Sequence, residues 1–289
     1  MTGAAAGDDG WDGERSRRWV EQSAGLERQL APIGELLFAA ARLAPRETVV
    51  DIGCGTGPTT YAAAARVGPD GRVVGVDVSA TMVDAARAAE PQSPGSPPAP
   101  IEWVVADATT WAGEGEPFDA VISRFGVMFF DDPDAAFANL ARATAPGGRL
   151  AMVVWPRREE SELFEVPLAA ALRTLADAGV PAQEPPADQG PFSLSDRVAV
   201  TAMLTDAGWS DVEWAPHDLM LSTGGGLDPA RAAASSMELG PTRIVTAELD
   251  DDTRQLVLAA ITKEYEGRMD DGHVALGARV VVVTARRPS

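Results

Sequence analysis

The sequence predicts an α/β fold in which a largely parallel sheet is covered by helices on both faces. Short runs of apolar and β-branched residues recur along the first half of the chain, and Ala-rich stretches with helical spacing lie between them. Strands that are apolar almost throughout are typical of a parallel sheet buried on both sides. No repeat of fixed period is visible, which excludes solenoids and propellers.

The first half of the chain provides five of the expected strands. They lie at 48–52, 72–77, 101–105, 118–122 and 149–154, and the helices between them at 61–67, 80–89 and 134–143. The motif Ala145-Pro146-Gly147-Gly148 is a helix stop signal and should separate the last of these helices from the fifth strand. An amphipathic helical segment at 11–43 precedes the first strand.

The second half is expected to complete the sheet around long insertions. The further elements are a helix at 195–207 and the sixth and seventh strands at 212–221 and 278–284. About 55 residues separate these two strands, far more than a usual connection. The resulting division is an N-terminal helical cap at 1–45 and a main domain at 46–289, with helical lid insertions at about 156–194 and 222–276.

Composition and charge exclude several classes of protein. The chain has 289 residues and a formal net charge of -19, so its surface field repels nucleic acid and anionic lipid. No apolar run approaches the roughly 18 residues of a membrane span, and the N-terminus has no signal-peptide pattern. A single cysteine, Cys54, and two histidines cannot provide a disulfide framework or a dedicated soft-metal site. We therefore expect a cytoplasmic protein with no nucleic-acid partner, no membrane partner and no metal.

A glycine-rich loop after the first strand is the strongest local signal of a ligand site. It reads Asp51-Ile52-Gly53-Cys54-Gly55-Thr56-Gly57. The glycines permit positive φ and bring amide N–H groups close to a ligand, and the following helix N-terminus adds partial positive charge. A dinucleotide fingerprint would need glycine where Pro58 stands, and a P-loop would need a lysine, whereas the single lysine is Lys263. The loop therefore predicts a small anionic or zwitterionic ligand.

Polar residues also follow the next three strands. Asp77 ends the second strand, where a carboxylate can accept hydrogen bonds from both hydroxyls of an unmodified ribose. Asp107 follows the third strand, where it can accept from an adenine amino group, and the segment 123–128 follows the fourth. Because the carboxyl ends of parallel strands meet at one edge of the sheet, we expect these groups to converge on one pocket.

These motifs together resemble the class I S-adenosylmethionine-dependent methyltransferases. The resemblance runs from about 46 to 155 and resumes in the last two strands. It implies a Rossmann-like, doubly wound, seven-stranded sheet of order 3-2-1-4-5-7-6 with strand 7 antiparallel, and S-adenosyl-L-methionine as cofactor. Trp19-Val20, Pro32 and the run 124–130 are similar to small-molecule enzymes of the ubiquinone and natural-product type.

The resemblance also implies a role for each motif residue. Gly53, Gly55 and Gly57 would line the methionine moiety of the cofactor, and Asp51, also counted among the cofactor-binding residues, would support that loop. Asp77 would hold the ribose, Val78 and Met82 would lie on the adenine faces, Asp107 and Ala108 would meet the adenine edge, and Ser123 would lie near the sulfonium and methyl. Trp19, Phe125 and Met128 are expected to line the substrate pocket. No catalytic residue is assigned: His273, in a turn before the seventh strand, is a weak candidate base, and orientation under the lid is expected to supply most of the rate.

The expected activity is methyl transfer to an oxygen, nitrogen or carbon of a small, largely apolar metabolite, in specialised metabolism. The alternative is a S-adenosylmethionine-binding protein of the same fold that does not methylate and instead performs a reaction such as cyclisation, because a fold does not fix a function. The partner is expected to be the small-molecule acceptor. The oligomeric state stays open, with a homodimer among the expectations.

Overall fold

The computed structural model describes residues 11, 13–89, 98–111, 113 and 115–289. Within this part of the chain, eight strands form a sheet in the order β3-β2-β1-β4-β5-β8-β6, and the short β7 pairs with β8. The strands are β1 (Thr48–Ile52), β2 (Arg72–Asp77), β3 (Ile101–Val105), β4 (Phe118–Arg124), β5 (Thr144–Val154), β6 (Ser210–Ser222), β7 (Met269–Asp270) and β8 (His273–Arg286). β1 to β5 form parallel pairs, whereas β8 is antiparallel to β5 and β6. The predicted order and the antiparallel strand are confirmed, with β8 as the predicted seventh strand and β7 as an addition.

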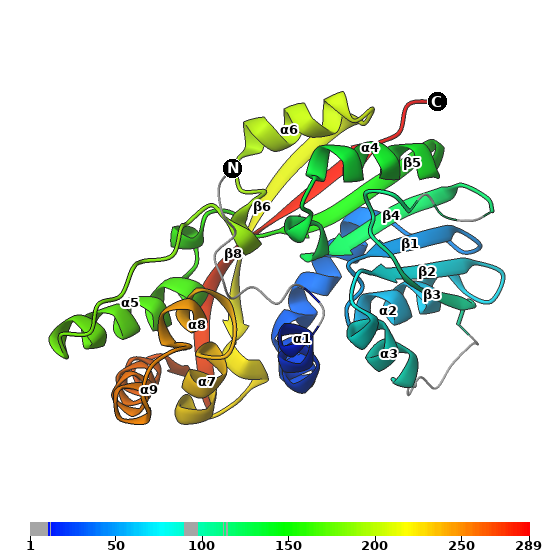
Figure 1. Cartoon of the computed structure of the whole chain (residues 1–289). Coiled ribbons are helices and arrows are strands. Elements are labelled where there is room, and N and C mark those ends of the chain that lie inside the picture. Colours follow the sequence, from blue (N-terminus) through cyan, green and yellow to red (C-terminus); the bar gives the residue numbers. More distant parts are fainter. Residues whose placement is uncertain (1–10, 12, 90–97, 112, 114) are drawn as a thin grey trace.

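The central strands are buried because helices cover both faces of the sheet. Figure 1 shows α1 (Glu14–Ala41), α2 (Pro58–Val67) and α3 (Ala80–Ala88) on one face, and α4 (Pro133–Ala143) and α6 (Arg197–Asp206) on the other. Val49 and Val50 in β1 point to opposite faces and are both fully buried, as are Val73 and Val74 in β2. A strand covered on both sides needs apolar residues at every position, which is the continuous pattern of the sequence.

The start of β5 differs from the prediction. The motif Ala145-Pro146-Gly147-Gly148 was expected to precede the strand, but β5 already begins at Thr144 and includes it. Thr144 pairs with Phe118 of β4, and the register shifts before the pair of Ala120 with Arg149. The end of the chain holds the motif extended, because the Gly147 N–H donates to the Arg287 carbonyl at 3.0 Å and the Arg287 N–H donates to the Gly148 carbonyl at 2.9 Å. A helix stop signal depends on neighbouring residues, so it cannot predict a contact between segments that are this far apart in the sequence.

The two ranges expected to form a lid contain helices that gather around the far ends of β6 and β8 (Figure 1). These helices are α5 (Glu162–Asp177), α7 (Pro229–Ser236), α8 (Gly240–Thr246) and α9 (Asp251–Glu266), with the single turns η2 (Arg158–Glu160), η3 (Gly190–Phe192) and η4 (Thr223–Gly225). Leu168 of α5 and Ile261 of α9 are among their buried apolar residues. β8 begins five residues earlier than predicted, at His273, because it pairs with β6 well beyond the end of β5.

The cap is one long helix, α1, and the part of the predicted cap at residues 1–10 and 12 lies outside the described residues. Its C-terminal half packs on the sheet through Ile33, Leu37 and Ala41, which are fully buried. Its N-terminal half passes the carboxyl ends of the parallel strands (Figure 1). Of the helices in the described ranges, none is long and apolar enough to cross a membrane.

Candidate cofactor site

The glycine loop adopts the conformation that its glycines permit. Gly53, Gly55 and Gly57 have φ of 65°, 55° and 88°, a region that residues with a Cβ adopt at a cost. The N–H groups of Gly53 and Cys54 donate to the Val76 carbonyl of β2 at 2.8 and 3.1 Å. Burial, and then the charges of Asp51 and Asp77, raise the pKa of the Cys54 thiol. Cys54 is therefore a small neutral residue in a tight turn rather than a reactive thiolate.

The loop also touches the turn that follows β4. A Cβ on Gly126 would lie 2.6 Å from the Gly53 Cα and 2.6 Å from the Ile52 carbonyl oxygen. The φ of Gly126 is not positive, so its backbone conformation does not require glycine. Glycine is needed at this position because there is no room for a Cβ. The ends of β1 and β4 are thus in direct backbone contact, and the convergence of these two segments is confirmed.

Asp51 is a fully buried carboxylate beneath the loop. Its Oδ2 accepts hydrogen bonds from the hydroxyls of Thr59 and Thr60 at 2.6 and 2.7 Å, at the start of α2. Its Oδ1 is buried and has no hydrogen-bond partner among the described residues. Burial raises the pKa of Asp51 from 3.8 to about 6, against the opposing effect of the two hydroxyls. A buried carboxylate oxygen without a partner can accept a hydrogen bond from a bound ligand.

Asp77 stands at the end of β2 and ties two turns together. Its Oδ2 accepts the Gly55 N–H and its Oδ1 accepts the Ser79 N–H, both at 2.9 Å. Burial raises the pKa of Asp77, while the hydrogen bonds from Ser79 and Gly55 act in the opposite direction. The side chain faces the glycine loop, so the sequence prediction that Asp77 and the loop share one site is consistent with this geometry.

The predicted adenine residues lie between β2 and α3, on α3, and in the turn after β3. Val78 is 48% exposed and Met82 is 6% exposed, on either side of the α3 N-terminus. Asp107 is exposed and accepts the Thr109 N–H at 2.8 Å, while Ala108 is buried. The Ala106 N–H donates to the Asp77 carbonyl at 3.0 Å, which joins this turn to the end of β2.

Ser123, Phe125 and Met128 follow one another at the end of β4. The fully buried Ser123 hydroxyl donates to the Ile52 carbonyl at 2.7 Å and accepts the Val127 N–H at 3.3 Å, so it holds two backbone segments together. Phe125 has φ 69°, and its ring stacks on Trp155 with centroids 4.4 Å apart. Met128 is buried, and its sulfur accepts the Trp155 N–H at 3.3 Å.

An aromatic cluster joins the start of the cap to the turn after β4. The Trp11 ring lies 6.1 Å from Trp19 and 4.9 Å from Phe129 of η1 (Gly126–Phe129), measured between centroids. The Arg15 guanidinium carbon lies 4.2 Å from the Trp11 centroid and 5.3 Å from the Phe129 centroid. These residues form an aromatic wall that contains one permanent positive charge.

The groups most often used as bases lie elsewhere. The chain has two histidines and one lysine. His217 pairs with Val280, so it is level with the carboxyl end of β5, but it lies on the edge strand β6, three strands away from β4 and roughly 14 Å from it at about 4.8 Å per strand. Lys263 lies on α9. His273 begins β8, eight residues before Val281, which pairs with the last residue of β5. At about 3.3 Å per residue, His273 is roughly 26 Å past the carboxyl end of β5.

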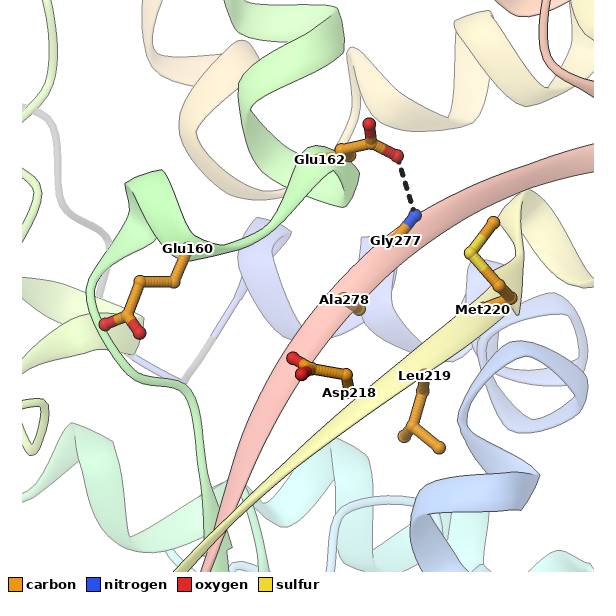
Figure 2. Close-up of a pocket in the computed structure, with 7 residues that line it drawn as sticks. All are labelled: Glu160, Glu162, Asp218, Leu219, Met220, Gly277 and Ala278. Atoms are coloured by element: carbon orange, nitrogen blue, oxygen red, sulfur yellow. Dashed lines mark hydrogen bonds between the residues drawn. The ribbon is translucent and has the colours of Figure 1, made fainter.

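A hollow of about 350 Å³ lies between α5 and the long β6–β8 pair, where these two strands extend beyond the end of β5 (Figure 2). Its acidic side chains already have partners. Glu162 accepts the Gly277 N–H at 3.0 Å, and Asp218 and Glu160 pair with Arg279 at 2.7 and 3.3 Å. Glu162 satisfies an N–H of β8 where the strand extends beyond β5, so these charges stabilise an exposed sheet edge.

The structure adds residues that the sequence analysis did not select. Asn139 of α4 donates to the carbonyls of Ala108 and Trp111, at 2.9 and 2.5 Å, and so shapes the turn after β3. Ser79 caps α3 and receives the Met82 N–H at 3.3 Å. A serine directly before a helix is a readable capping signal, whereas nothing in the sequence indicates which turn a helical asparagine reaches.

Residues 49–148 match a family model described as a methyltransferase domain. The chain is 30% identical over 275 residues to a trans-aconitate 2-methyltransferase of Methylobacterium radiotolerans, covering 91% of this chain and 95% of the relative. It is 28% identical over 269 residues to a nocamycin O-methyltransferase of Saccharothrix syringae, covering 89% and 92%. A methyltransferase-fold structure from Anabaena variabilis superposes with a TM-score of 0.58 at 18% identity, over 89% of this chain and 98% of that one, and shows likeness of fold alone. The chain therefore belongs to the class I S-adenosylmethionine-dependent methyltransferases, with S-adenosylmethionine as its cofactor.

Proposed function

We propose that this enzyme methylates a carboxylate oxygen of a small, largely apolar molecule of specialised metabolism. The observation that carries the proposal is the position of the basic side chains. Neither histidine nor the lysine lies on β1, β2 or β4, whose carboxyl ends form the cofactor site, and His217 lies on the edge strand β6, three strands away from β4. The acceptor should therefore be a group that needs no proton removed before it attacks.

The proposed cofactor position follows the strand ends. The glycine loop surrounds the methionine moiety, Asp77 binds the ribose hydroxyls, Val78 and Met82 contact the adenine faces, and Asp107 and Ala108 meet its edge. The free Oδ1 of Asp51 fits the α-ammonium of the methionine moiety, because a buried carboxylate oxygen is stabilised by a positive donor. Ser123 acts by holding the ends of β1 and β4 together at this point.

The acceptor side is proposed to be the aromatic wall and the end of β4. Trp19 with Trp11, and Phe125 with Met128, supply apolar surface. The Arg15 guanidinium lies over the Trp11 and Phe129 rings and extends the wall along the start of the cap. The helices in 156–194 and 222–276, together with the cap at 1–45, are proposed to exclude water and to orient the acceptor on the main domain at 46–289.

The chemistry is simple for a carboxylate. When bound, S-adenosylmethionine supplies a methyl group on a sulfonium that leaves as a neutral thioether. One carbon–oxygen bond forms, one carbon–sulfur bond breaks, and no proton moves, since a carboxyl of ordinary pKa near 4 is already ionised at pH 7. A phenol with a pKa near 10 would instead need a base. Of the relatives, one is named for trans-aconitate, a carboxylate anion, and one for O-methylation.

Methyl transfer to matched acids and alcohols tests the proposal. The enzyme is incubated with S-adenosylmethionine labelled in the methyl group and with an aromatic polyketide acid or its primary alcohol, and trans-aconitate serves as a polar carboxylate for comparison. We expect label in the aromatic acid as a methyl ester, which mild alkali releases, and a kcat/KM that stays flat between about pH 7 and 9. Label that resists alkali, or a rate that rises with pH toward the pKa of a phenol, would contradict a carboxylate acceptor.

A further inference from the structure

We propose that Ser16 of the cap is a positioning residue of the ribose subsite. Through the Ser79 hydroxyl it holds the turn that carries Asp77, so that docking of the cap and binding of the cofactor stabilise each other. The inference rests on the proposed role of Asp77 as the ribose ligand. It adds a residue that is 63 positions from Ser79 in the sequence, on a helix with no cofactor motif.

The contact is a chain of three hydroxyl and carbonyl groups. The Ser79 Oγ–H donates to the Ser16 Oγ at 2.9 Å, and the Ser16 Oγ–H donates to the Trp11 carbonyl. Both serines have no exposed surface. Each hydroxyl has one proton to donate. Ser79 donates its proton to Ser16 and Ser16 donates its own to Trp11, so both hydrogen bonds run from the Asp77 turn toward the cap.

Ser79 transmits this contact to the carboxylate. Its N–H donates to Asp77 Oδ1 at 2.9 Å, and its Oγ accepts the Met82 N–H at 3.3 Å. Ser79 thus contacts Asp77 through its backbone N–H and the first turn of α3 through its hydroxyl, and the position of this one residue affects both contacts. Removing the Ser16 oxygen leaves the buried Ser79 O–H without its acceptor, and the Ser79 side chain must turn to find another.

The cap has a second attachment that keeps it folded without Ser16. Glu27, further along α1, forms an ion pair with Arg124 at the end of β4. The start of the cap also carries Trp11 and Trp19 of the aromatic wall. Ser16 therefore links the ribose turn to the surface proposed for the acceptor, and by reciprocity cofactor binding should favour the docked cap.

A double-mutant cycle tests the link, with S-adenosylhomocysteine as the probe. We expect S16A to weaken its binding roughly tenfold in calorimetry, from the loss of one buried hydrogen bond. In the D77N background, where the ribose contact is already impaired, S16A should change the affinity less than about threefold. The matched control is S23A, on the same helix. Among the described residues, the Ser23 hydroxyl bonds to the Val20 carbonyl alone, at 2.7 Å, and its removal should leave the affinity within twofold.

A structural role without coupling would give a different result. In that case S16A would lower the melting temperature, but its effect on affinity would be equal in both backgrounds, and this result would overturn the inference. Hydrogen exchange gives an independent measurement: saturating S-adenosylhomocysteine should slow exchange of the amides of residues 14–20 in the parent and much less in S16A. Equal slowing in both proteins would also overturn it. If the parent does not bind S-adenosylhomocysteine, or if D77N binds as tightly as the parent, the cofactor placement fails and the inference fails with it.

Discussion

Replacing Asp51 by Asn should change how the free energy of unfolding depends on pH. The carboxyl is fully buried, one oxygen has no partner among the described residues, and its pKa is raised from 3.8 to about 6. A carboxyl with a raised pKa keeps its proton longer in the folded protein than in the unfolded chain. Its contribution to stability is therefore complete below about pH 4 and is lost as the pH rises through about 6.

The size of the effect follows from the two pKa values. At about 1.4 kcal/mol per pKa unit, the whole difference corresponds to about 3 kcal/mol, of which roughly 2.4 kcal/mol falls between pH 4 and pH 7, because the carboxyl of the unfolded chain is already more than half ionised at pH 4. An asparagine does not ionise in this range. The buried amide costs stability because its N–H groups need acceptors, but that cost does not depend on pH. The free energy of unfolding of D51N, relative to the parent, should thus rise by roughly 2.4 kcal/mol from pH 4 to pH 7.

Urea unfolding followed by tryptophan fluorescence measures this difference. The control is D84N, which removes a carboxylate of α3 whose side chain is 72% exposed, and its difference from the parent should stay within about 0.5 kcal/mol. A D51N difference that is constant across the range would show that Asp51 does not titrate there. A D51N variant that becomes relatively less stable as the pH rises would mean that the charged carboxylate is favoured, contrary to the reasoning from burial.

Three other substitutions test the site. D77A should weaken binding of S-adenosylhomocysteine by about 2 to 4 kcal/mol in calorimetry, through loss of charge-assisted bonds to the ribose, and a Kd within threefold of the parent would remove that assignment. G126A should lower the free energy of unfolding by about 1 to 3 kcal/mol, because its Cβ would meet Gly53 at 2.6 Å, whereas G267A, whose Cβ has its nearest contact at 3.6 Å, should change it by less than about 0.5 kcal/mol. H273A should lower kcat less than about tenfold, since His273 begins β8 far from the site, and a loss above a hundredfold with cofactor affinity intact would place it in the mechanism.

Much of the fold was readable from the sequence because its signals are local. A strand buried on both faces shows a continuous apolar run, as in β1 and β2, whose predicted bounds agree with the structure. Glycine has a distinct conformational range, so the loop from Gly53 to Gly57 was recognisable without any knowledge of its neighbours. The position of Asp77 at a strand end followed from the same pattern, and the ligand that it contacts stays a prediction.

Other features depend on which distant segments meet, and only the tertiary structure decided them. β5 begins at Thr144 because the end of the chain pairs with Gly147 and Gly148. The pKa of Asp51 is raised because the surrounding layers exclude water, and no local spacing encodes burial. In the same way, a serine in an amphipathic helix carries no sign that its hydroxyl will meet Ser79. Sequence periodicity determines which face of an element is apolar, whereas the partner of a single polar atom is determined by how the elements pack, to within a fraction of an ångström.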